Sequence, residues 1–442
     1  MKSRLTTELS DQIRKVVRLS LPAIVTQIAA VAMQYIDSAM VGKLGADASA
    51  AIGLVSSSTW LIDGLGTSLA AGFSVQIAQY IGAGRADEAR RVEKHGLVAA
   101  LLMSLLMMLF GMGISGSLPQ WLGADRVLWK DASAYFFVFS ASLPFLQMVW
   151  LTSACLQCSG NMIVPSVLNA VMCGLDVLFN SYFIPRYGVL GAALGTALSV
   201  AVVSLILLCY CCLISSSLRI NRKEPCKWEF AIWKRALKIA APLAAEQAAT
   251  CGAMVATTRI TAPLGSVAIA ANSFAITAEG LCFMSGYGIA SAATAMVGQS
   301  IGAADYRGAR RMGYITVIMG GGLMGLAGLA MMGFCPWVFR FLTPDPQVQQ
   351  VATQILRIGL LAEALFGVSI VASGALRGAE DTLVPSILNL LSIWVVRIGL
   401  ALLLVKPFGI HGVWVAMTVE LCVRGLVMLW RLGRSPYLKE RA

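Results

Sequence analysis

The chain has 442 residues, of which 58% are hydrophobic and only 13% are charged, and its formal net charge is +12. Soluble domains carry about a quarter charged residues, so this composition excludes an ordinary soluble protein and predicts one that spans a membrane. Apolar runs of about 20 residues, enough to cross a hydrocarbon core of about 30 Å, recur along the chain and are too continuous for the short alternating strands of a barrel.

Twelve membrane-spanning helices are expected. In chain order they lie at about 15–42, 48–80, 95–117, 133–155, 162–184, 189–213, 236–257, 267–300, 312–334, 350–374, 384–404 and 410–430. Gly, Ala and Ser are abundant between the larger side chains, which suits close packing of helices in lipid. The predicted fold class is therefore an all-α polytopic membrane protein.

The second half of the chain repeats the first half at a constant offset. Leu156–Asn169 reads LQCSGNMIVPSVLN and Leu376–Asn389 reads LRGAEDTLVPSILN, while Pro22 recurs at the same spacing as Pro242. An offset without slippage indicates one duplicated unit. Six spans per half is an even number, so we expect two six-helix lobes related by a pseudo-two-fold axis along the membrane normal. The expected parts are an N-terminal lobe (1–214), a basic cytoplasmic linker (215–235) and a C-terminal lobe (236–442).

Lys and Arg indicate the orientation. With a cytoplasmic N-terminus, 25 of the 34 Lys and Arg residues lie on the inner face, eight lie in outer loops or at span ends, and Arg397 alone lies inside a span. This positive-inside pattern predicts a multi-pass protein of the inner (plasma) membrane with both termini in the cytoplasm. The positive charge is then a basic rim that meets anionic lipid, and nucleic acid is not an expected partner.

Residues suited to enzyme chemistry are sparse. Cys155 and Cys158 form a CxxC pair, but the matching positions of the second half hold alanine and glycine, so packing of small side chains explains the pair better than metal or redox chemistry. The only histidines, His95 and His411, each lie near a membrane face. No Ser/His/Asp set and no HExxH motif is present, so neither an enzyme nor a cofactor is expected.

Acidic side chains inside the spans carry the functional argument. A charge near the bilayer centre costs about 2.5–3.5 kcal/mol on insertion scales, so such residues indicate function by default. The deep acids are Asp37, Asp63, Asp176, Glu246, Glu279, Glu363 and Glu420. Their excess over the single deep cation, Arg397, favours a pathway that handles cations over a purely structural network. Arg397 and Glu420 are expected to form a structural pair, with a transport role as the alternative.

Asp37 and Asp176 break the repeat. At the constant offset their counterparts are Thr257 and Val396, so neither acid is expected to belong to the duplicated scaffold. Function added to a packing framework is expected to show itself as such an asymmetry. We therefore expect both acids to be functional, and not caps near span ends.

Polar neighbours accompany both acids. Gln34 lies one turn before Asp37, and Asn180 lies one turn after Asp176, so each amide is placed to hydrogen-bond its acid. Pro22, in the earlier part of the span that contains Asp37, removes a backbone hydrogen bond and allows this first span to bend.

Four separated segments carry a family resemblance. They are Asp37–Gly53 (DSAMVGKLGADASAAIG), Gly82–Arg90, Gly188–Thr196 and Leu376–Pro385. Together they resemble the multidrug and toxic compound extrusion (MATE) transporters over essentially the whole chain, and the pair Leu175-Asp176 resembles the prokaryotic DinF-type branch. The resemblance implies two six-helix lobes around a central cleft, and export of organic cations in exchange for inward H+ or Na+.

The resemblance also implies roles for single residues. Asp37 and Asp176 match the cation-coupling acids, Pro22 matches the hinge whose bend follows protonation, and Thr196 matches a polar ligand. Sodium-binding relatives carry Asn where this chain has Met172, which favours protons, with Na+ at Asp37 and Asp176 as the alternative.

The second lobe offers only secondary candidates by this resemblance. Phe366 occupies the position of the tenth-span acid of other branches. The remaining acids to consider are Glu246, Glu279, Glu363 and Asp63. Of these, Asp63 and Glu279 could either line the cleft or cap a hydrated cavity.

The expected activity is secondary active efflux of lipophilic organic cations by rocking of the two lobes, with Tyr35 and Trp60 offering cation–π contacts. The expected partners are small-molecule cations and the lipid bilayer, and the protein is expected to act as a monomer. Three alternatives stay open: a flippase for a lipid-linked precursor, which should need a basic cavity, a membrane enzyme and a passive channel.

Overall fold

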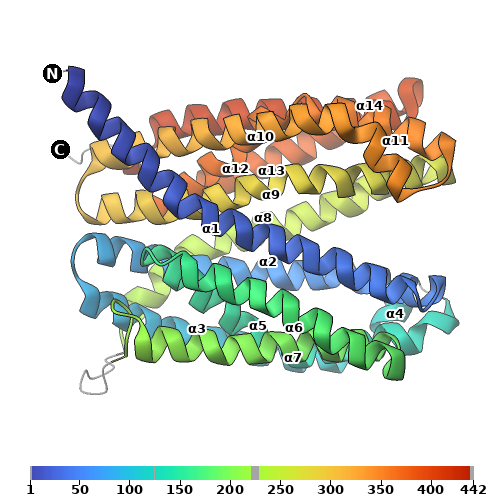
Figure 1. Ribbon diagram of the computed structural model, residues 1–442, viewed down its shortest axis with the longest axis horizontal. Helices are drawn as coiled ribbons and strands as arrows, with labels where there is room; N and C mark the ends of the chain where they lie inside the picture. The colour runs from blue at the N-terminus through green and yellow to red at the C-terminus, as the bar shows by residue number, and fades with distance from the viewer. Residues whose placement is uncertain (1, 124, 221–227, 439–442) are drawn as a thin grey trace. The chain divides into compact units, whose positions relative to one another are not determined.

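The computed structural model describes residues 2–123, 125–220 and 228–438, the side chains of residues 2–9 and 46 excepted. Residues 221–227 of the expected linker lie outside this part, as do Lys439 and Arg441 and the side chains of Lys2 and Arg4, all counted above on the inner face. Within the described ranges all regular secondary structure is helical (Figure 1). The predicted all-α fold class is confirmed.

The helices follow one another with short connections. Up to residue 220 they are α1 (Lys2–Gly42), α2 (Ala46–Gly82), α3 (Ala86–Ile114), α4 (Leu118–Trp121), α5 (Arg126–Cys158), α6 (Ile163–Tyr187), α7 (Val189–Cys209) and the π-helix η1 (Tyr210–Ile214). After residue 228 they are α8 (Phe230–Thr261), the 3₁₀ turn η2 (Ala262–Leu264), α9 (Ser266–Gly302), α10 (Tyr306–Leu342), α11 (Pro346–Leu360), α12 (Glu363–Gly378), α13 (Leu383–Leu391), the π-helix η3 (Ser392–Ile398), α14 (Gly399–Arg434) and the 3₁₀ turn η4 (Pro436–Leu438).

The described helices account for the twelve expected spans. By length and composition ten are able to cross a membrane, and α11 with α12, bent by 54° at a short break, make an eleventh. The stretch Leu383–Arg434 has 52 residues, about 78 Å of helix, which is more than twice the hydrocarbon thickness. Non-helical backbone at Gly409 divides it, so it supplies two spans.

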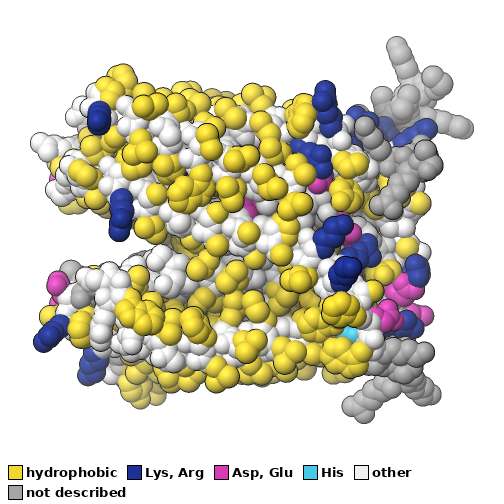
Figure 2. All heavy atoms as spheres, turned by 180° about the vertical axis from the view of Figure 1, so that it is seen from behind, with side chains coloured by type: hydrophobic (Ala, Val, Ile, Leu, Met, Phe, Trp, Pro, Cys, Tyr) yellow, Lys and Arg dark blue, Asp and Glu magenta, His cyan; other side chains and the backbone are white. Residues whose placement is uncertain are grey.

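The surface agrees with a membrane environment. Figure 2 shows hydrophobic side chains over most of the visible face, while Lys and Arg gather toward the helix ends. Long exposed side chains such as Leu106 (67%), Phe110 (69%) and Leu403 (70%) would be costly in water, but they suit the lipid tails.

The chain forms two compact units. One consists of residues 1–27 with 245–442, and the other of residues 28–244. These boundaries differ from the lobes expected from the repeat, because α1 and α8 each contribute residues to both units. In the unit of residues 28–244, Nε2 of Gln76 donates to the carbonyl of Ile232 (3.3 Å), which ties the first part of α8 to α2. The bounds of the expected lobes stay a proposal.

The duplication is visible in the backbone. Gly84 and Ala304, which correspond in the repeat, both adopt a left-handed conformation, with φ of 71° and 58°. Gly160 and Glu380, another corresponding pair, do the same, with φ of 98° and 63°. The N–H groups of Gly84 and Ala304 each donate to the carbonyl three residues earlier, at 3.1 and 2.9 Å. The turns therefore kept their shape even where the second copy lost its glycine.

The offset changes at η3, which corrects the expectation of a constant value. Gly188 and Gly409 share a left-handed backbone, with φ of 59° and 56°, although their separation in sequence is one position longer than that of Gly84 and Ala304. Gly191 and Gly412 show the same longer separation. Each lies so close to a preceding helix that a Cβ would come within 2.3 and 2.2 Å of a backbone carbonyl oxygen there. A π turn accommodates one residue more than an α turn, so η3 accounts for the extra residue.

Candidate functional site

Asp37 lies in the part of α1 that belongs to the unit of residues 28–244. Its carboxylate oxygen Oδ1 accepts a hydrogen bond from Nδ2 of Asn180 on α6 (2.8 Å). The same amide nitrogen donates to Oδ2 of Asp176, one turn earlier on α6 (3.1 Å). Asn180 therefore joins the two acids that break the repeat, as the sequence predicted for Asp176.

Asp176 and Asn180 are fully buried, and Asp37 is half-buried. The carboxyl groups of Asp37 and Asp176 lie within hydrogen-bonding reach of one another. Two carboxylates at this separation repel one another when both are ionised, and a proton or another cation between them removes the repulsion. We call Asp37, Asp176 and Asn180 the carboxyl pair site.

Helix α7 completes the carboxyl pair site. The hydroxyl of Ser199 donates to Oδ1 of Asp176 at 3.5 Å and to the carbonyl of Thr196 at 2.8 Å. Gly195 leaves room for the amide, because a Cβ there would lie 2.0 Å from Oδ1 of Asn180. Sequence reasoning missed Ser199; the available signal was its place one turn after Thr196 on a buried helix face.

Other predicted residues lie around the site without joining it. Asp37 is bonded by Asn180 and not by Gln34, whose side chain is exposed in the described structure and whose carbonyl accepts from Ser38 (2.9 Å). Thr196 contributes its carbonyl to Ser199, and no hydrogen bond joins its hydroxyl to either acid in the described ranges. Tyr35 and Trp60 are 37% and 42% exposed, as ring contacts for a ligand require.

Asp63 lies on α2 of the same unit. Its Oδ1 is buried and has no hydrogen-bond partner among the residues described. Tyr135 on α5 lies within electrostatic reach of Asp37, Asp63 and Asp176. Asp63 therefore forms no hydrogen bond with the carboxyl pair site in the described part of the chain.

The donor set of the carboxyl pair site consists of oxygen atoms. Asp37 and Asp176 offer carboxylates, Ser199 offers a hydroxyl, and Oδ1 of Asn180 is buried without a hydrogen-bond partner in the described part of the chain. Hard cations prefer such ligands, so these residues fit either a proton or a small alkali cation. Within the described residues, no group of three or more His, Cys, Asp and Glu side chains is arranged for a metal ion.

Glu246 is bound by the duplicated motif of the other unit. Its two carboxylate oxygens accept hydrogen bonds from the hydroxyl of Ser386 and from Nδ2 of Asn389, both at 2.6 Å. These two residues belong to the second copy of the VPSxLN segment. Glu246 therefore joins α8 to α13.

Glu279 and Glu363 lie near the break between α11 and α12. Glu363 is the first residue of α12, is 1% exposed, and neither of its carboxylate oxygens has a hydrogen-bond partner within the described ranges. Glu279 on α9 is 5% exposed and lies within electrostatic reach of Glu363. The expected tenth span is thus a broken helix with an acid at the break.

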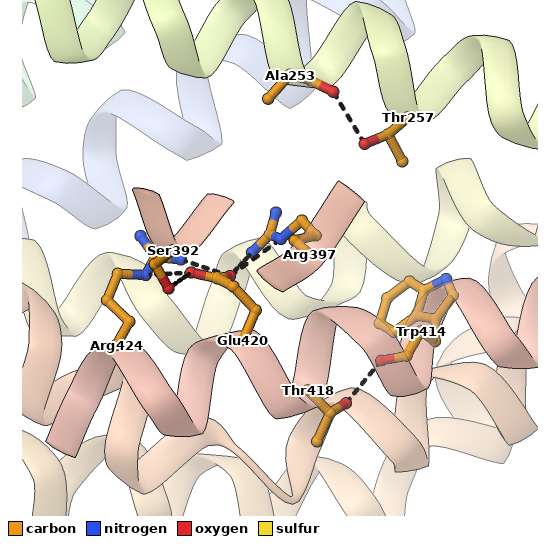
Figure 3. Close-up of polar contacts among 8 residues, drawn as sticks. All are labelled: Ala253, Thr257, Ser392, Arg397, Trp414, Thr418, Glu420 and Arg424. Carbon is orange, nitrogen blue, oxygen red and sulfur yellow. Dashed lines mark hydrogen bonds and ion pairs between the residues drawn. The ribbon is translucent and has the colours of Figure 1, made fainter. Parts of the chain in front are cut away.

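Arg397 and Glu420 form the expected ion pair. Nε and Nη2 of Arg397 donate to Oε2 of Glu420 at 3.0 and 2.6 Å (Figure 3). Arg424, one turn after Glu420, and the hydroxyl of Ser392 bind the same carboxylate, each at 2.8 Å. Sequence reasoning assigned Arg424 to the inner face, yet its side chain is only 13% exposed and belongs to this cluster. We call these four residues the guanidinium cluster.

The extra residue of η3 changes which positions correspond. After the π turn the offset between the copies is longer by one, so Ser199 corresponds to Glu420. Arg397 lies inside η3, and at the same longer offset its counterpart is Asp176. The longer offset thus replaces the expected pairing of Asp176 with Val396. Asp176, which accepts from Ser199, and Arg397, which donates to Glu420, are therefore corresponding residues of opposite charge.

Comparison with known proteins adds three findings. The model of one protein family, MatE, matches residues 22–182 and 242–403. A probable multidrug resistance protein NorM of Thermotoga maritima is 26% identical over 97% of this chain and 94% of its own, and one of Mesorhizobium japonicum is 29% identical over 95% and 93%. A solved structure described as the outward-facing conformation of a multidrug resistance MATE family transporter of the MOP superfamily aligns with a TM-score of 0.92, 22% identity and 97% coverage of both chains.

Proposed function

The chain belongs to the MatE family, and we propose that it is a secondary active transporter that exports lipophilic organic cations by antiport with H+ or Na+. MatE proteins are transporters and not enzymes, and the helices of this chain make it a multi-pass membrane protein. The relatives named as multidrug resistance proteins cover almost its full length. The proposal places it in the inner membrane, as a monomer with cytoplasmic termini.

The carboxyl pair site is the observation that carries the proposal. Two deep acids, one fully buried, are joined by one amide nitrogen and have no basic partner among the hydrogen bonds of the described residues. Keeping an unneutralised acid pair in the membrane is costly, so the pair has a high affinity for a cation. A drug cation and a coupling ion then compete for the same negative charge.

The transport cycle follows from this competition. When Asp37 and Asp176 are ionised they attract an organic cation, and exposed rings such as Tyr35 and Trp60 add cation–π contacts. Ions that enter from outside neutralise the acids and release the cation there. The membrane potential contributes about 2.3 kcal/mol per charge per 100 mV. Pro22 is the proposed hinge in α1.

The coupling ion is proposed to be H+. A carboxyl pair needs a single proton to lose its repulsion, whereas Na+ needs several oxygen ligands at once. Met172, at the position of the family's Asn ligand, supplies no oxygen. Oδ1 of Asn180 and the hydroxyl of Ser199 are the oxygens that would replace it in a sodium site.

Everted membrane vesicles test the proposal. An imposed pH gradient should drive uptake of a cationic dye such as ethidium into vesicles that contain the protein, and a sodium gradient alone should drive little. Dye uptake under the sodium gradient only would reverse the choice of ion. No uptake under either gradient, together with movement of a lipid-linked precursor across the bilayer, would favour the flippase alternative.

A further inference from the structure

The guanidinium cluster occupies the place in one unit that the carboxyl pair site occupies in the other. Arg397 corresponds to Asp176, and Thr257 on α8 corresponds to Asp37 on α1. Neither acid of the carboxyl pair site therefore has an acidic counterpart in the second copy. What stands there is a permanent positive charge, because a guanidinium does not lose its proton in proteins.

Arg397 is firmly positioned. One edge of its guanidinium, formed by Nε and Nη2, is held by Glu420, which is fully buried. Arg424 contacts both oxygens of Glu420, through an ion pair with Oε1 (2.8 Å) and a hydrogen bond to Oε2 (3.2 Å). Its guanidinium also lies over the ring of Phe366, 5.5 Å from the centroid. A planar fork held at one edge has little rotational freedom left, so its other edge is already oriented for a partner.

The other edge of Arg397 is free. No residue in the described part of the chain accepts a hydrogen bond from its Nη1, and 23% of the side chain is exposed. In Figure 3 this nitrogen points away from Glu420, toward α8, where Ala253 and Thr257 lie. The hydroxyl of Thr257 donates its hydrogen bond to the carbonyl of Ala253 (2.9 Å), and no hydrogen bond joins it to Arg397 among the described residues.

A contact beside Arg397 joins η3 to α8. Nε1 of Trp394, one turn before Arg397, donates to the carbonyl of Ala249 on α8 at 3.1 Å. Its ring lies against Gly252, where a Cβ would come within 3.3 Å. Trp394 therefore fixes η3 to α8 one turn from Arg397, and Ala253 and Thr257 are the labelled α8 residues on the side toward which Arg397 points.

The guanidinium cluster carries an excess of positive charge. Two guanidinium groups share the single carboxylate of Glu420. Glu279 lies within electrostatic reach of Arg397 but forms no ion pair with it among the residues described. An excess charge inside the membrane calls for a counter-charge, and a carboxylate matches the free fork of Arg397 with two parallel hydrogen bonds.

We propose that the free edge of Arg397 is a binding site for the carboxylate group of an organic amphiphile, with Glu420 and Arg424 as positioning residues. A carboxylate is favoured over a phosphate because only one guanidinium edge is free, which suits a single negative charge. The inference rests on the proposed function in one respect: the amphiphile that binds at Arg397 is a compound that the protein exports.

Two dyes that differ in one ester group test the site. A rhodamine with a free carboxyl group and its methyl ester are titrated by fluorescence against the full chain in nanodiscs. Wild type should bind both. Arg397→Gln should weaken binding of the acid about tenfold or more, as expected for the loss of a charge-assisted hydrogen bond, and leave the ester unchanged. Arg340→Gln, which removes an exposed charge from the same unit, should change neither dye.

The outcomes separate the alternatives. Equal weakening of both dyes by Arg397→Gln, or no change in either, would overturn the proposal. If this variant fails to fold, Arg397→Lys keeps the charge but loses the planar pair of donors. It should weaken binding of the acid dye several-fold more than binding of the ester. An unchanged ratio would again overturn the site. Vesicles that export neither dye would contradict the proposed function, while the titration would still decide whether Arg397 binds the carboxylate.

Discussion

The carboxyl pair site and the guanidinium cluster show which features the two copies of the duplicated unit share and which differ between them. In the unit of residues 28–244, two carboxyl groups surround one amide. In the unit that contains residues 245–442, two guanidinium groups surround one carboxylate, and one of them, Arg397, corresponds to Asp176. The backbone of the two copies is preserved down to single left-handed residues, such as Gly84 and Ala304. The charged side chains therefore differ between the two copies, while the backbone conformation of the turns is the same.

The difference is also one of chemistry. A carboxyl group can gain and lose a proton in the physiological range when its surroundings change, whereas a guanidinium stays charged. On the proposed function, the first site responds to an ion gradient, whereas the second keeps its charge. One copy is suited to coupling and the other to a constant charge.

Neutralising the carboxyl pair should give the largest effect. Asp37→Asn keeps the size of the side chain but cannot bind a proton or hold a cation, so gradient-driven dye transport should fall to background in everted vesicles. Asp47→Asn, which changes an exposed acid in the first turn of α2, should transport normally. Full transport by Asp37→Asn at wild-type expression would show that the pair is not the coupling site.

Neutralising the acid of the guanidinium cluster should affect stability instead. Glu420→Gln leaves Arg397 and Arg424 buried without their counter-charge, and breaking a buried pair costs about 3–5 kcal/mol. Asp176→Asn, at the position that corresponds to Arg397, removes a charge but leaves no buried cation without its counter-charge. Its unfolding temperature should therefore be close to that of the wild type. Thermal unfolding in detergent compares the two, and equal stability of both variants would contradict the contrast between the sites.

The smallest effect is expected at the turns that the two copies share. Gly84→Ala places a Cβ on a left-handed residue with open space around it, so it should destabilise by about 1 kcal/mol through backbone strain alone. Ala304→Gly relieves the same strain in the second copy and should stabilise by a similar amount. Denaturant midpoints measure both, and effects of the same sign would mean that the two turns are not equivalent in energy.

Much of the fold could be predicted because each membrane-spanning helix is a long apolar run that is visible in the sequence. The break between α11 and α12 could not, since Leu361 and Ala362 are ordinary helix formers and no proline lies between the two helices. The only sequence feature at this break is the deep acid Glu363, which is the first residue of α12. The extra residue in η3 changes neither hydropathy nor charge, and only the spacing of Gly188 and Gly409 reveals it.

The carboxyl pair site was predictable in part. Asp37, Asp176 and Asn180 were found because acids are rare in spans and these acids interrupt the repeat. Ser199 escaped because serine is common in membrane helices and serves packing as often as binding. The correspondence of Arg397 with Asp176 required three-dimensional information, since a shift of one residue within a π turn leaves no trace in composition.

The division of α1 between the two units has a consequence for biosynthesis. The residues before Ile28 belong to a unit whose other members begin at Ala245, and the backbone of Ile24 approaches Gly288 so closely that a Cβ there would lie 2.6 Å away. This part of α1 therefore waits for partners that are synthesised only after residue 244. Contacts so distant in sequence form slowly, so a nascent chain that ends before α9 lacks the packing of Ile24 against Gly288.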